Sequence, residues 1–395
     1  MTNDILLSLD KGKSVLLVTL DVSAAFDTFN HSMLLERYRT DFGMEGLALK
    51  WMASYLEGRM QSVQIGTSKS EPYLSESGFP QGSVLGRPKF SMHTTPLDAL
   101  VRSHEVEDQC YADDSNLYVT LDLKDPIQTQ DQLLRIEDCL SDVSNWMLRN
   151  RLKVNASKTT SILFTPTSRT LSVPPTADIV FDGSIITTSN VLKSLGVLLD
   201  PTMTMTKQVN SVVSSAWIQL RNISKTRNQL SRKVAETLVN TLVTSKLDYC
   251  NSLLCCLPAK LLNKLQKVQN ASAKTVLLAR KRSHVTPLLK QLHWLPVELL
   301  CKYKILLLAY KVLNNSAPSY LKDLVSYHVP PRNLRSSNEK YLTRKYGKTK
   351  YGSRAFSCLA PSLWNSLPLS IRQAETLLDF KTKLKTHFFI EHFGP

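Results

Sequence analysis

The sequence of 395 residues has no run of 18 consecutive apolar residues, so it predicts no transmembrane helix. Its start, Met1-Thr2-Asn3-Asp4, lacks the basic and apolar segments of a signal peptide. The seven cysteines form no regular framework, which favours reduced thiols in an intracellular protein. Four of them have no histidines at zinc-ligand spacing, which argues against a zinc site: Cys250, Cys255, Cys256 and Cys301.

Acidic residues are scarce in the second half of the chain. Residues 201–395 contain 31 Lys and Arg against 8 Asp and Glu, a net charge of +23, whereas residues 1–200 contain 18 against 25. A basic surface can simply be solvated, but an excess of this size favours contact with nucleic acid. The acid-rich first half could instead hold metal ions. The length and the 43% hydrophobic content predict two or three folded units.

Hydrophobic periodicity in the first 200 residues mixes strands with helices, as in an α+β fold. A hairpin is predicted at Asp182-Gly183, a typical two-residue turn. The helix over 126–151 has an apolar face formed by Leu133, Leu134, Ile136, Leu140, Val143 and Met147. We expect strands at 15–22, 60–65 (half-buried), 162–164, 179–181 and 184–186, with 191–199 closing the strand-rich part. Helices are expected at 27–42, 45–56 and from Val84.

The second half of the chain is predicted to be mostly helical. Helices are expected at 205–230, 233–248, 258–281 and 294–314. The helix at 258–281 has separate apolar and lysine-rich faces, typical of a helix that packs on a core and exposes its other side. From about Pro330 the chain is rich in Arg, Lys, Ser and Gly with interleaved aromatic residues. This segment is either a partly ordered nucleic-acid-binding tail or a loosely packed extension.

Two carboxylate positions point to one shared site. The apolar run Val15–Leu20 ends in Asp21, and a buried strand that ends in an acid presents that acid at its carboxyl end. The pair Asp113-Asp114 lies between two strand-like runs, where a tight hairpin turn is expected. Taken alone, Asp-Asp is an ordinary turn dipeptide. Together with Asp21 it becomes a candidate metal site.

A glycine-containing loop lies between these carboxylates in the sequence. Gly78-Phe79-Pro80-Gln81-Gly82-Ser83 precedes a predicted helix, so its backbone can approach a ligand, although it could equally be a plain helix entry. Carboxylates and such a loop suit two-metal phosphoryl transfer, in which two Mg²⁺ ions about 4 Å apart need converging carboxylates. Mg²⁺ takes few protein ligands, so two or three Asp suffice.

At these residues the sequence resembles reverse transcriptases of LINE-type, non-LTR retrotransposons over most of its length. The first catalytic motif is similar to 20–27, the second to 78–86 and the third to 111–114. The fourth is similar to 155–159, the primer-grip motif to 195–197, and the end of such open reading frames to 356–368. Five ordered motifs are specific together. The resemblance implies a right-hand polymerase palm, an antiparallel sheet with helices, followed by a mostly α-helical thumb and C-terminal region.

The resemblance also implies roles for individual residues. Asp21, Asp113 and Asp114 would hold Mg²⁺, or Mn²⁺ in its place, with the carbonyl of Val22. Lys158 would act near the pyrophosphate as a proton donor; without the resemblance it is an ordinary solvated lysine. Phe26 would lie under the sugar and exclude a 2′-hydroxyl, in addition to packing in the core. Three residues would contact template and incoming nucleotide: Pro80, Gln81 and Gly82.

The sequence departs from the family at several positions. Gly86-Arg87-Pro88-Lys89 stands where the family has Gly-Pro and two apolar residues, and Asn30 stands where it commonly has Asp. The family's endonuclease and the fingers region that clamps the triphosphate would lie before the first motif. We therefore expect a truncated or decayed copy, or a piece of a longer protein, in which this chain alone polymerises weakly or not at all.

Three functions remain open on the sequence. The first is an RNA-directed DNA polymerase acting on an RNA template, a DNA primer and dNTPs, without a membrane and with an unknown oligomeric state. The second is a catalytically silent nucleic-acid-binding remnant. The third is a nucleotide cyclase, disfavoured by the glycine loop and the basic helices.

The expected domains are a palm at 1–165, a primer-grip segment at 166–200, a thumb-like region at 201–329 and a basic region at 330–395. The family implies the nucleus and the cytoplasm.

Overall fold

The computed structural model describes residues 1–23, 28, 30–75, 77–78, 83–112, 114–167, 177–330 and 339–394. The fold class is α+β, as predicted. The chain forms two compact units. One consists of Met1 and Gly12–Leu195, and the other of Thr2–Lys11 and Gly196–Pro395. No helix in these ranges is both long and apolar enough to cross a membrane.

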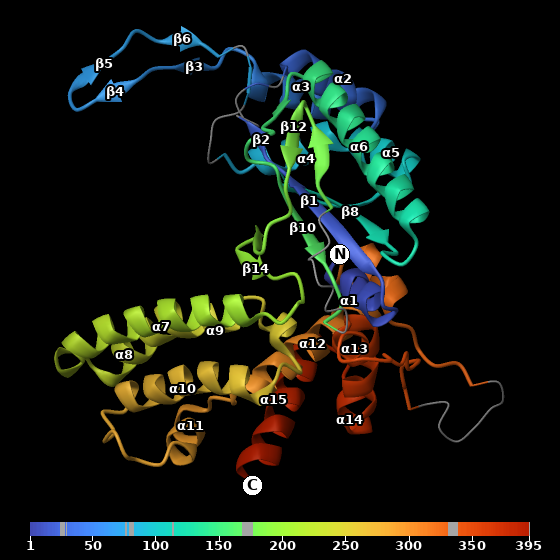
Figure 1. The fold of residues 1–395 in the computed structure, drawn as a ribbon. Coiled ribbons are helices and arrows are strands. Elements are labelled where there is room, and N and C mark those ends of the chain that lie inside the picture. Colours follow the sequence, from blue (N-terminus) through green and yellow to red (C-terminus); the bar gives the residue numbers. More distant parts are fainter. Residues whose placement is uncertain are drawn as a thin grey trace. The chain divides into compact units, whose positions relative to one another are not determined.

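An antiparallel four-stranded sheet forms the centre of the first unit (Figure 1). Its strands, in the order of pairing, are β10 (Thr160–Phe164), β1 (Ser14–Leu20), β8 (Asp114–Leu121) and β7 (Glu107–Tyr111). Leu16 of β1 lies opposite Val119 of β8 and Leu163 of β10, and all three are buried. The continuous apolar run of β1 therefore became a buried central strand, as predicted, because neighbouring strands and helices cover it.

Helices of the first unit pack on this sheet. They are α2 (His31–Thr40), α3 (Gly46–Leu56), α4 (Gly86–Thr94), α5 (Pro96–Ser103) and α6 (Pro126–Arg149). In α6 the predicted apolar face is confirmed at Ile136, Leu140, Val143 and Met147, which are buried. Leu134 was wrongly placed on that face, since its side chain is 51% exposed. One residue turns a helix by about 100°, so Leu134 points away from the row begun by Leu133.

The predicted helix at 27–42 begins later, because Asn30 caps it. The Asn30 side chain accepts hydrogen bonds from the backbone N–H groups of Ser32 and Met33, which orders the start of α2. Asp, common at this position in the family, caps helices equally well, so this departure leaves the local structure intact. The helix predicted at 45–56 is confirmed as α3.

Short hairpins account for the remaining strands of the first unit. The half-buried strand predicted at 60–65 is wrong: β3 (Met60–Gln61) and β4 (Gln64–Ile65) are exposed and pair with β6 (Tyr73–Leu74) and β5 (Ser68–Lys69). The hairpin at Asp182-Gly183 is confirmed between β11 (Ile179–Phe181) and β12 (Ser184–Ile186). Both turn residues have positive φ, 49° and 71°, as such tight turns require. A further short pair joins β2 (Val22–Ser23) to β9 (Lys153–Val154).

The strand-rich stretch predicted at 191–199 is confirmed, and it consists of two strands. It is interrupted between β13 (Leu192–Ser194) and β14 (Val197–Leu199), because Leu195 and Gly196 have φ angles of 46° and 79°. Positive φ at two successive residues breaks an extended strand. Leu195 is a non-glycine residue in this region, which sequence patterns do not reveal.

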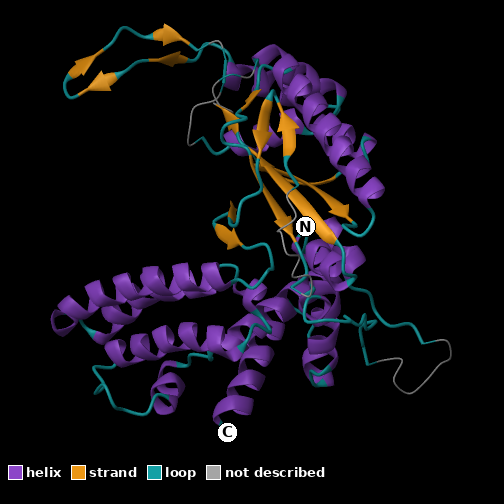
Figure 2. Cartoon of the chain, in the orientation of Figure 1, coloured by secondary structure: helices purple, strands orange, loops and turns teal. Residues whose placement is uncertain are grey.

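The second unit is built mainly from helices, drawn purple in Figure 2. The four helices predicted in this half of the chain are confirmed. The second of them contains a π-helical turn at Asn240–Thr244. The helix α11 was not predicted, because it is short. The α-helices after β14 are α7 (Thr206–Thr226), α8 (Arg232–Val239), α9 (Ser245–Asp248), α10 (Ala259–Val276), α11 (Thr286–Leu292), α12 (Val297–Leu313), α13 (Phe356–Asn365), α14 (Leu369–Arg372) and α15 (Leu377–Phe393).

The C-terminal segment is packed, so the expectation of a loosely packed extension is wrong for residues 339–394. Trp364 of α13 and Phe380 of α15 are buried, with ring centroids 5.7 Å apart, and Phe380 stacks on Tyr310 of α12 at 4.3 Å. Asn365 both donates to and accepts from the backbone of Leu342. These contacts form a packed core. The amino-acid composition of the segment did not predict this core, because its few large aromatic rings are scattered among basic residues.

The helix α1 (Thr2–Asp10) belongs to the second unit, although it begins the chain. The Asp10 carboxylate accepts hydrogen bonds from the backbone N–H groups of Lys348 (2.9 Å), Thr349 (2.6 Å) and Gly352 (3.3 Å). Partial burial raises the pKa of Asp10, but these hydrogen bonds outweigh it and leave that pKa below its usual value. The ionised carboxylate thus organises the turn before α13.

Candidate active site

Strand register places Asp21 beside the β7–β8 turn. Leu20, the last residue of β1, pairs with Ser115 of β8, so Asp21 and Asp114 follow at the same end of the two adjacent strands. The carbonyl oxygen of Asp21 accepts a hydrogen bond from the backbone N–H of Asn155 at 2.8 Å. The chain is thereby anchored where β1 ends and the Asp21 side chain emerges half-exposed.

The hairpin predicted around the Asp-Asp pair is confirmed. Tyr111 of β7 pairs with Asp114 of β8, and Ala112 is the described residue between the two strands. Ala112 has a φ of 56°, typical of two-residue hairpin turns. Asp114 is exposed, whereas Ser115 and Asn116 are buried in the sheet. An acid at this turn is accessible to cations from solvent.

Lys158 meets Asp21 at this sheet end. Its Nζ lies 3.6 Å from Asp21 Oδ2, with the two side chains 68% and 45% exposed. The loop that carries Lys158 is ordered by the Asn155 carbonyl, which accepts hydrogen bonds from the N–H groups of Lys158 and Thr159. Pairing of Val22 with Val154 holds this loop beside the end of β1. The exposed ion pair itself adds little stability, so both groups remain available to a ligand.

The structure thus brings together four predicted site residues, Asp21, Val22, Asp114 and Lys158. The other five lie outside the described residues: Phe26, Pro80, Gln81, Gly82 and Asp113. The beginning of the glycine loop is described at Gly78, whose carbonyl lies 2.8 Å from Nε2 of His31. The loop therefore starts against the first turn of α2, close in sequence to the first motif.

The described side chains do not enclose a metal ion by themselves. Within those ranges no group of three or more His, Cys, Asp or Glu residues could hold one. Asp21 and Asp114 supply carboxylate oxygens, and Val22 supplies a carbonyl oxygen, which are the ligand types that Mg²⁺ prefers. A complete ligand set would need a further group such as Asp113.

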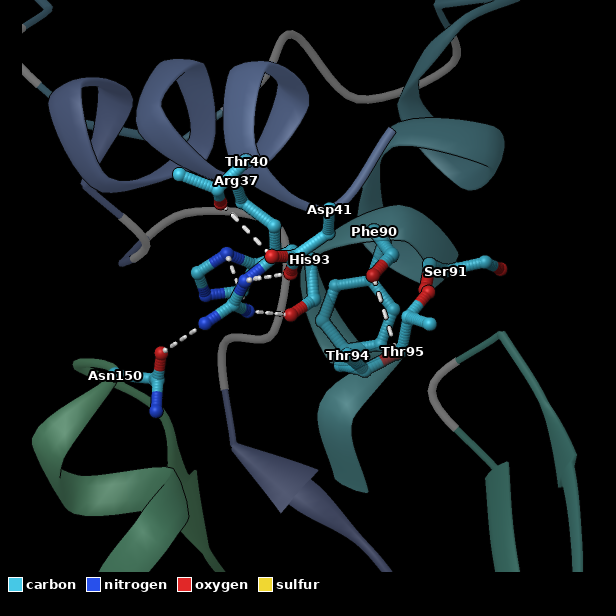
Figure 3. A network of polar contacts seen from close by, with 9 residues as sticks. All are labelled: Arg37, Thr40, Asp41, Phe90, Ser91, His93, Thr94, Thr95 and Asn150. Carbon is cyan, nitrogen blue, oxygen red and sulfur yellow. Dashed lines mark hydrogen bonds and ion pairs between the residues drawn. The ribbon is translucent and has the colours of Figure 1, made fainter. Parts of the chain in front are cut away.

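Arg37 of α2 connects α4 and the residue after α6 in the first unit, and sequence reasoning missed it. Figure 3 shows its guanidinium reaching from α2 to the backbone carbonyl of His93 in α4 and to the side chain of Asn150, which follows α6. The Arg37 Nη2 to Asn150 Oδ1 distance is 3.1 Å, and Asp41 lies 3.4 Å from Nε. Burial and the nearby Arg37 charge lower the pKa of His93 to about 4, so its ring is neutral at pH 7. No local pattern predicts partners 56 and 113 residues away.

Lys89 is buried beneath Tyr55. Its side chain is 1% exposed, and Nζ lies 3.2 Å from the centroid of the Tyr55 ring. Burial, with a contribution from Arg59, lowers the pKa of Lys89 to about 8. The sequence departure at Lys89 therefore places a cation in the core of the first unit, where it faces an aromatic ring. Loosening of the template side by this cation stays a prediction.

Comparison with known proteins gives the family. The profile of the family described as "Reverse transcriptase (RNA-dependent DNA polymerase)" matches residues 2–199, about half of the chain. A probable RNA-directed DNA polymerase from transposon BS of Drosophila melanogaster is 29% identical over 243 residues, 60% of this chain and 25% of that protein. The RNA-directed DNA polymerase from mobile element jockey of Drosophila funebris is 27% identical over 220 residues, 54% of this chain and 23% of that protein. The chain thus spans about a quarter of the length of these curated relatives.

Solved structures give weaker likenesses. A structure of telomerase from Candida tropicalis in complex with the TWJ fragment of telomeric RNA aligns with a TM-score of 0.42 and 12% identity, covering 98% of this chain and 51% of that one. A truncated apo telomerase from the same organism aligns with a TM-score of 0.36 and 14% identity, over 50% and 36% of the two chains. Such scores are too low to support a conclusion. The family profile and the transposon relatives carry the assignment: the chain belongs to the reverse transcriptase (RNA-dependent DNA polymerase) family, in its LINE-type, non-LTR retrotransposon branch.

Proposed function

We propose that this chain carries the RNA-directed DNA polymerase centre of its retrotransposon and adds dNTPs to a primer 3′-hydroxyl on an RNA template. The observation that carries the proposal is the register of β1 and β8, which sets Asp21 at the same sheet end as Asp114, the first residue of β8 and the neighbour of Asp113 in the sequence. Enzymes of this family generally use divalent metal ions. Acids that converge at a sheet end are what this chemistry requires.

In this proposal Asp21, Asp113, Asp114 and the carbonyl of Val22 hold Mg²⁺, with Mn²⁺ as a substitute. Bound there, the ions would activate the primer hydroxyl and neutralise charge on the leaving pyrophosphate. Lys158, which forms an ion pair with Asp21 at the same end of the sheet, neutralises developing negative charge and donates a proton to the leaving group.

The substrate contacts follow from the family motifs. Phe26 supports the sugar and excludes a 2′-hydroxyl. Pro80, Gln81 and Gly82 line the template and the incoming nucleotide, at the end of a loop that starts at the anchored Gly78. Residues 1–165 then form the palm and 166–200 the primer-grip segment.

The experiment is extension of a DNA primer on an RNA template with Mg²⁺, with Asp21→Asn and Asp113→Asn as the test variants. Asp182→Asn is the matched control, because Asp182 lies in another hairpin turn of the same unit with a φ of 49°, which Asn also tolerates. Because the chain alone is expected to polymerise weakly or not at all, the assay also uses a version that carries the fingers region of a close relative. In that version we expect both test variants to abolish extension and the control to retain it. Extension by the Asn variants at the rate of the unsubstituted chain would refute the site.

A second candidate function is that of a catalytically silent nucleic-acid-binding remnant. The +23 net charge of residues 201–395 favours it, since binding needs only that surface. In either case we propose that residues 201–329 act as a thumb whose exposed lysines, such as Lys260 and Lys267 of α10, follow a duplex backbone, and that 330–395 extend this basic surface.

Binding and extension together separate the two candidates. An RNA–DNA hybrid should bind the full chain with an affinity that falls steeply with salt and depends little on sequence. Salt-dependent binding without extension under any template, primer or metal condition supports the silent remnant. Salt-independent binding contradicts the thumb. The family implies that the chain is located in the nucleus and the cytoplasm. Fractionation of cells that express the chain tests this expectation.

A further inference from the structure

A cavity of about 290 Å³ opens in the second unit where α10, α11 and α12 meet. Its walls are aliphatic, with Leu262 from α10, Leu289 from α11 and Val297 from α12. Its polar lining combines the amides of Asn263, Gln266 and Asn270 of α10 with three further side chains, those of Thr286, Glu298 and His392. Glu298 is paired with Lys302, whose Nζ lies 2.8 Å from Glu298 Oε1. The volume lies near the lower limit of about 300 Å³ for small-molecule sites, so the cavity suits one planar ring system.

Gln266 fixes the amide of Asn270 in this cavity. Gln266 Oε1 accepts a hydrogen bond from the backbone N–H of Val297 at 2.9 Å, and its Nε2 donates to Asn270 Oδ1 at 2.7 Å. Among the described residues, this leaves the N–H donors of Asn270 and the whole amide of Asn263 without a protein partner. An amide offers both a donor and an acceptor, the combination that reads the edge of a nucleobase.

Basic residues lie close in sequence to the cavity lining. The segment between α10 and α11 carries Arg280, Lys281 and Arg282, shortly before the lining residues Val285 and Thr286. Lys274 Nζ donates to the carbonyl of Lys281 at 2.6 Å, which ties this segment to α10. Lys267 stands four residues after Asn263, so it borders the amide face of the helix. These cations favour phosphates on the side of the cavity that the segment before α11 borders, while the one lining carboxylate among the described residues, Glu298, has its charge offset by Lys302.

We propose that this cavity takes one unstacked base of a single-stranded nucleic acid, while the segment Arg280–Arg282 holds the adjacent phosphates. Aliphatic walls cover the ring faces, the amides of Asn263 and Asn270 bind its edge, and the cations neutralise the backbone. The proposal rests on nucleic-acid binding by the basic half of the chain and adds a base-dependent contact to it. It needs no polymerase activity.

The test measures how far binding to the full chain depends on bases. Fluorescence anisotropy compares the affinity for a labelled RNA pentamer with that for an abasic pentamer that has the same phosphates. The same comparison with an ordinary and an abasic DNA pentamer distinguishes RNA from DNA as the source of the base. We expect the chain to bind the base-containing pentamer about tenfold more tightly than the abasic one, because burial of the ring and hydrogen bonds to its edge add to the phosphate contacts. Asn263→Leu, similar in size but without the amide, should reduce this preference to about threefold or less and leave abasic binding unchanged.

Two controls keep the test specific. Asn222→Leu, at an exposed position of α7, should retain the full preference. Lys281→Gln should weaken binding of both pentamers alike, because it removes charge rather than base contacts. As a second measurement, photocrosslinking from 4-thiouridine should label residues within 262–298.

The outcomes distinguish this proposal from the proposed polymerase. Equal binding of ordinary and abasic pentamers, or an unchanged preference in Asn263→Leu, would overturn the base pocket alone. Absence of primer extension with the base preference intact would overturn the polymerase alone. Absence of any binding at low salt would overturn both the pocket and the nucleic-acid surface.

Discussion

Lys158 Nζ lies 3.6 Å from the carboxylate of Asp21, although 137 residues of chain separate the two. The pairing of β1 with β10 and of β2 with β9 brings them together at one end of the sheet. Neither residue identifies the other from sequence alone. Their proximity links the first and fourth family motifs in space.

Removing the Lys158 charge should slow catalysis far more than it destabilises the fold. For Lys158→Gln we expect a loss of about 10²–10³-fold in the single-nucleotide incorporation rate, typical of a lost preorganised charge. The loss in unfolding free energy should be below about 1 kcal/mol, because the ion pair is exposed. Lys158→Arg separates two roles: it restores the rate if only charge matters, but not if a proton is donated, since Arg keeps its proton. A Gln variant as fast as the parent would exclude any catalytic role.

Arg37 should be a major stabiliser of the first unit. Its side chain is 14% exposed, and Arg37→Met would leave the His93 carbonyl and Asn150 Oδ1 without their guanidinium donor. We expect a loss of about 2–4 kcal/mol, the range for breaking a buried charged contact. Hydrogen exchange of amides in α2, α4 and α6 should accelerate together. Arg39→Met, on the exposed side of the same helix, should change little; equal effects of both variants would contradict the role of Arg37.

Replacing Lys89 with Met should stabilise the first unit. The pKa of about 8 means that burial opposes the charged form, although the Tyr55 ring offsets part of this cost. Below pH 8 the lysine is protonated in both the folded and unfolded states and the cost is full, so Lys89→Met should gain about 1–3 kcal/mol at pH 7.

The same substitution predicts a change in pH dependence. Between about pH 8 and 10.5 the folded state has lost the Lys89 proton while the unfolded state retains it, so stability of the parent rises with pH. Lys89→Met should lack this rise, measured by thermal melting across the range. Lys50→Met, at an exposed position of α3, is the control. A rise of equal size in Lys89→Met would assign it to another group.

Asp10 should stabilise the second unit in its ionised form. Asp10→Asn weakens three backbone hydrogen bonds, from Lys348, Thr349 and Gly352, and should cost about 1–3 kcal/mol at pH 7. Because the folded pKa is lowered, the contribution is complete above the unfolded value of about 4 and is lost as pH falls through the folded pKa.

The measurement is the stability of both proteins as a function of pH. The difference between parent and Asp10→Asn should be constant above about pH 5 and shrink at lower pH. Asp323→Asn, an exposed carboxylate of the same unit, should show no such difference. A gap that persists at pH 2 would mean that geometry rather than charge is responsible.

Local patterns in the sequence determined much of the first unit. The apolar run of β1, the turn residues Asp182-Gly183 and the helical spacing of α6 each act within a few residues, so they predicted elements that the structure confirms. The ordered family motifs determined the assignment to the reverse transcriptases, and they named Asp21, Asp113 and Lys158 as candidates. Helices of the second unit were likewise readable from their periodicity.

Only the tertiary structure decided which distant groups meet. Register between β1 and β8 placed Asp21 beside the turn, because one residue of slippage would move every side chain to the other face. Arg37 found its partners, and α1 joined the second unit through Asp10, by contacts that no local pattern encodes. Burial of Trp364 was hidden for the same reason: a long-range core forms from residues whose sequence neighbours are polar, and its free energy depends on packing rather than on composition.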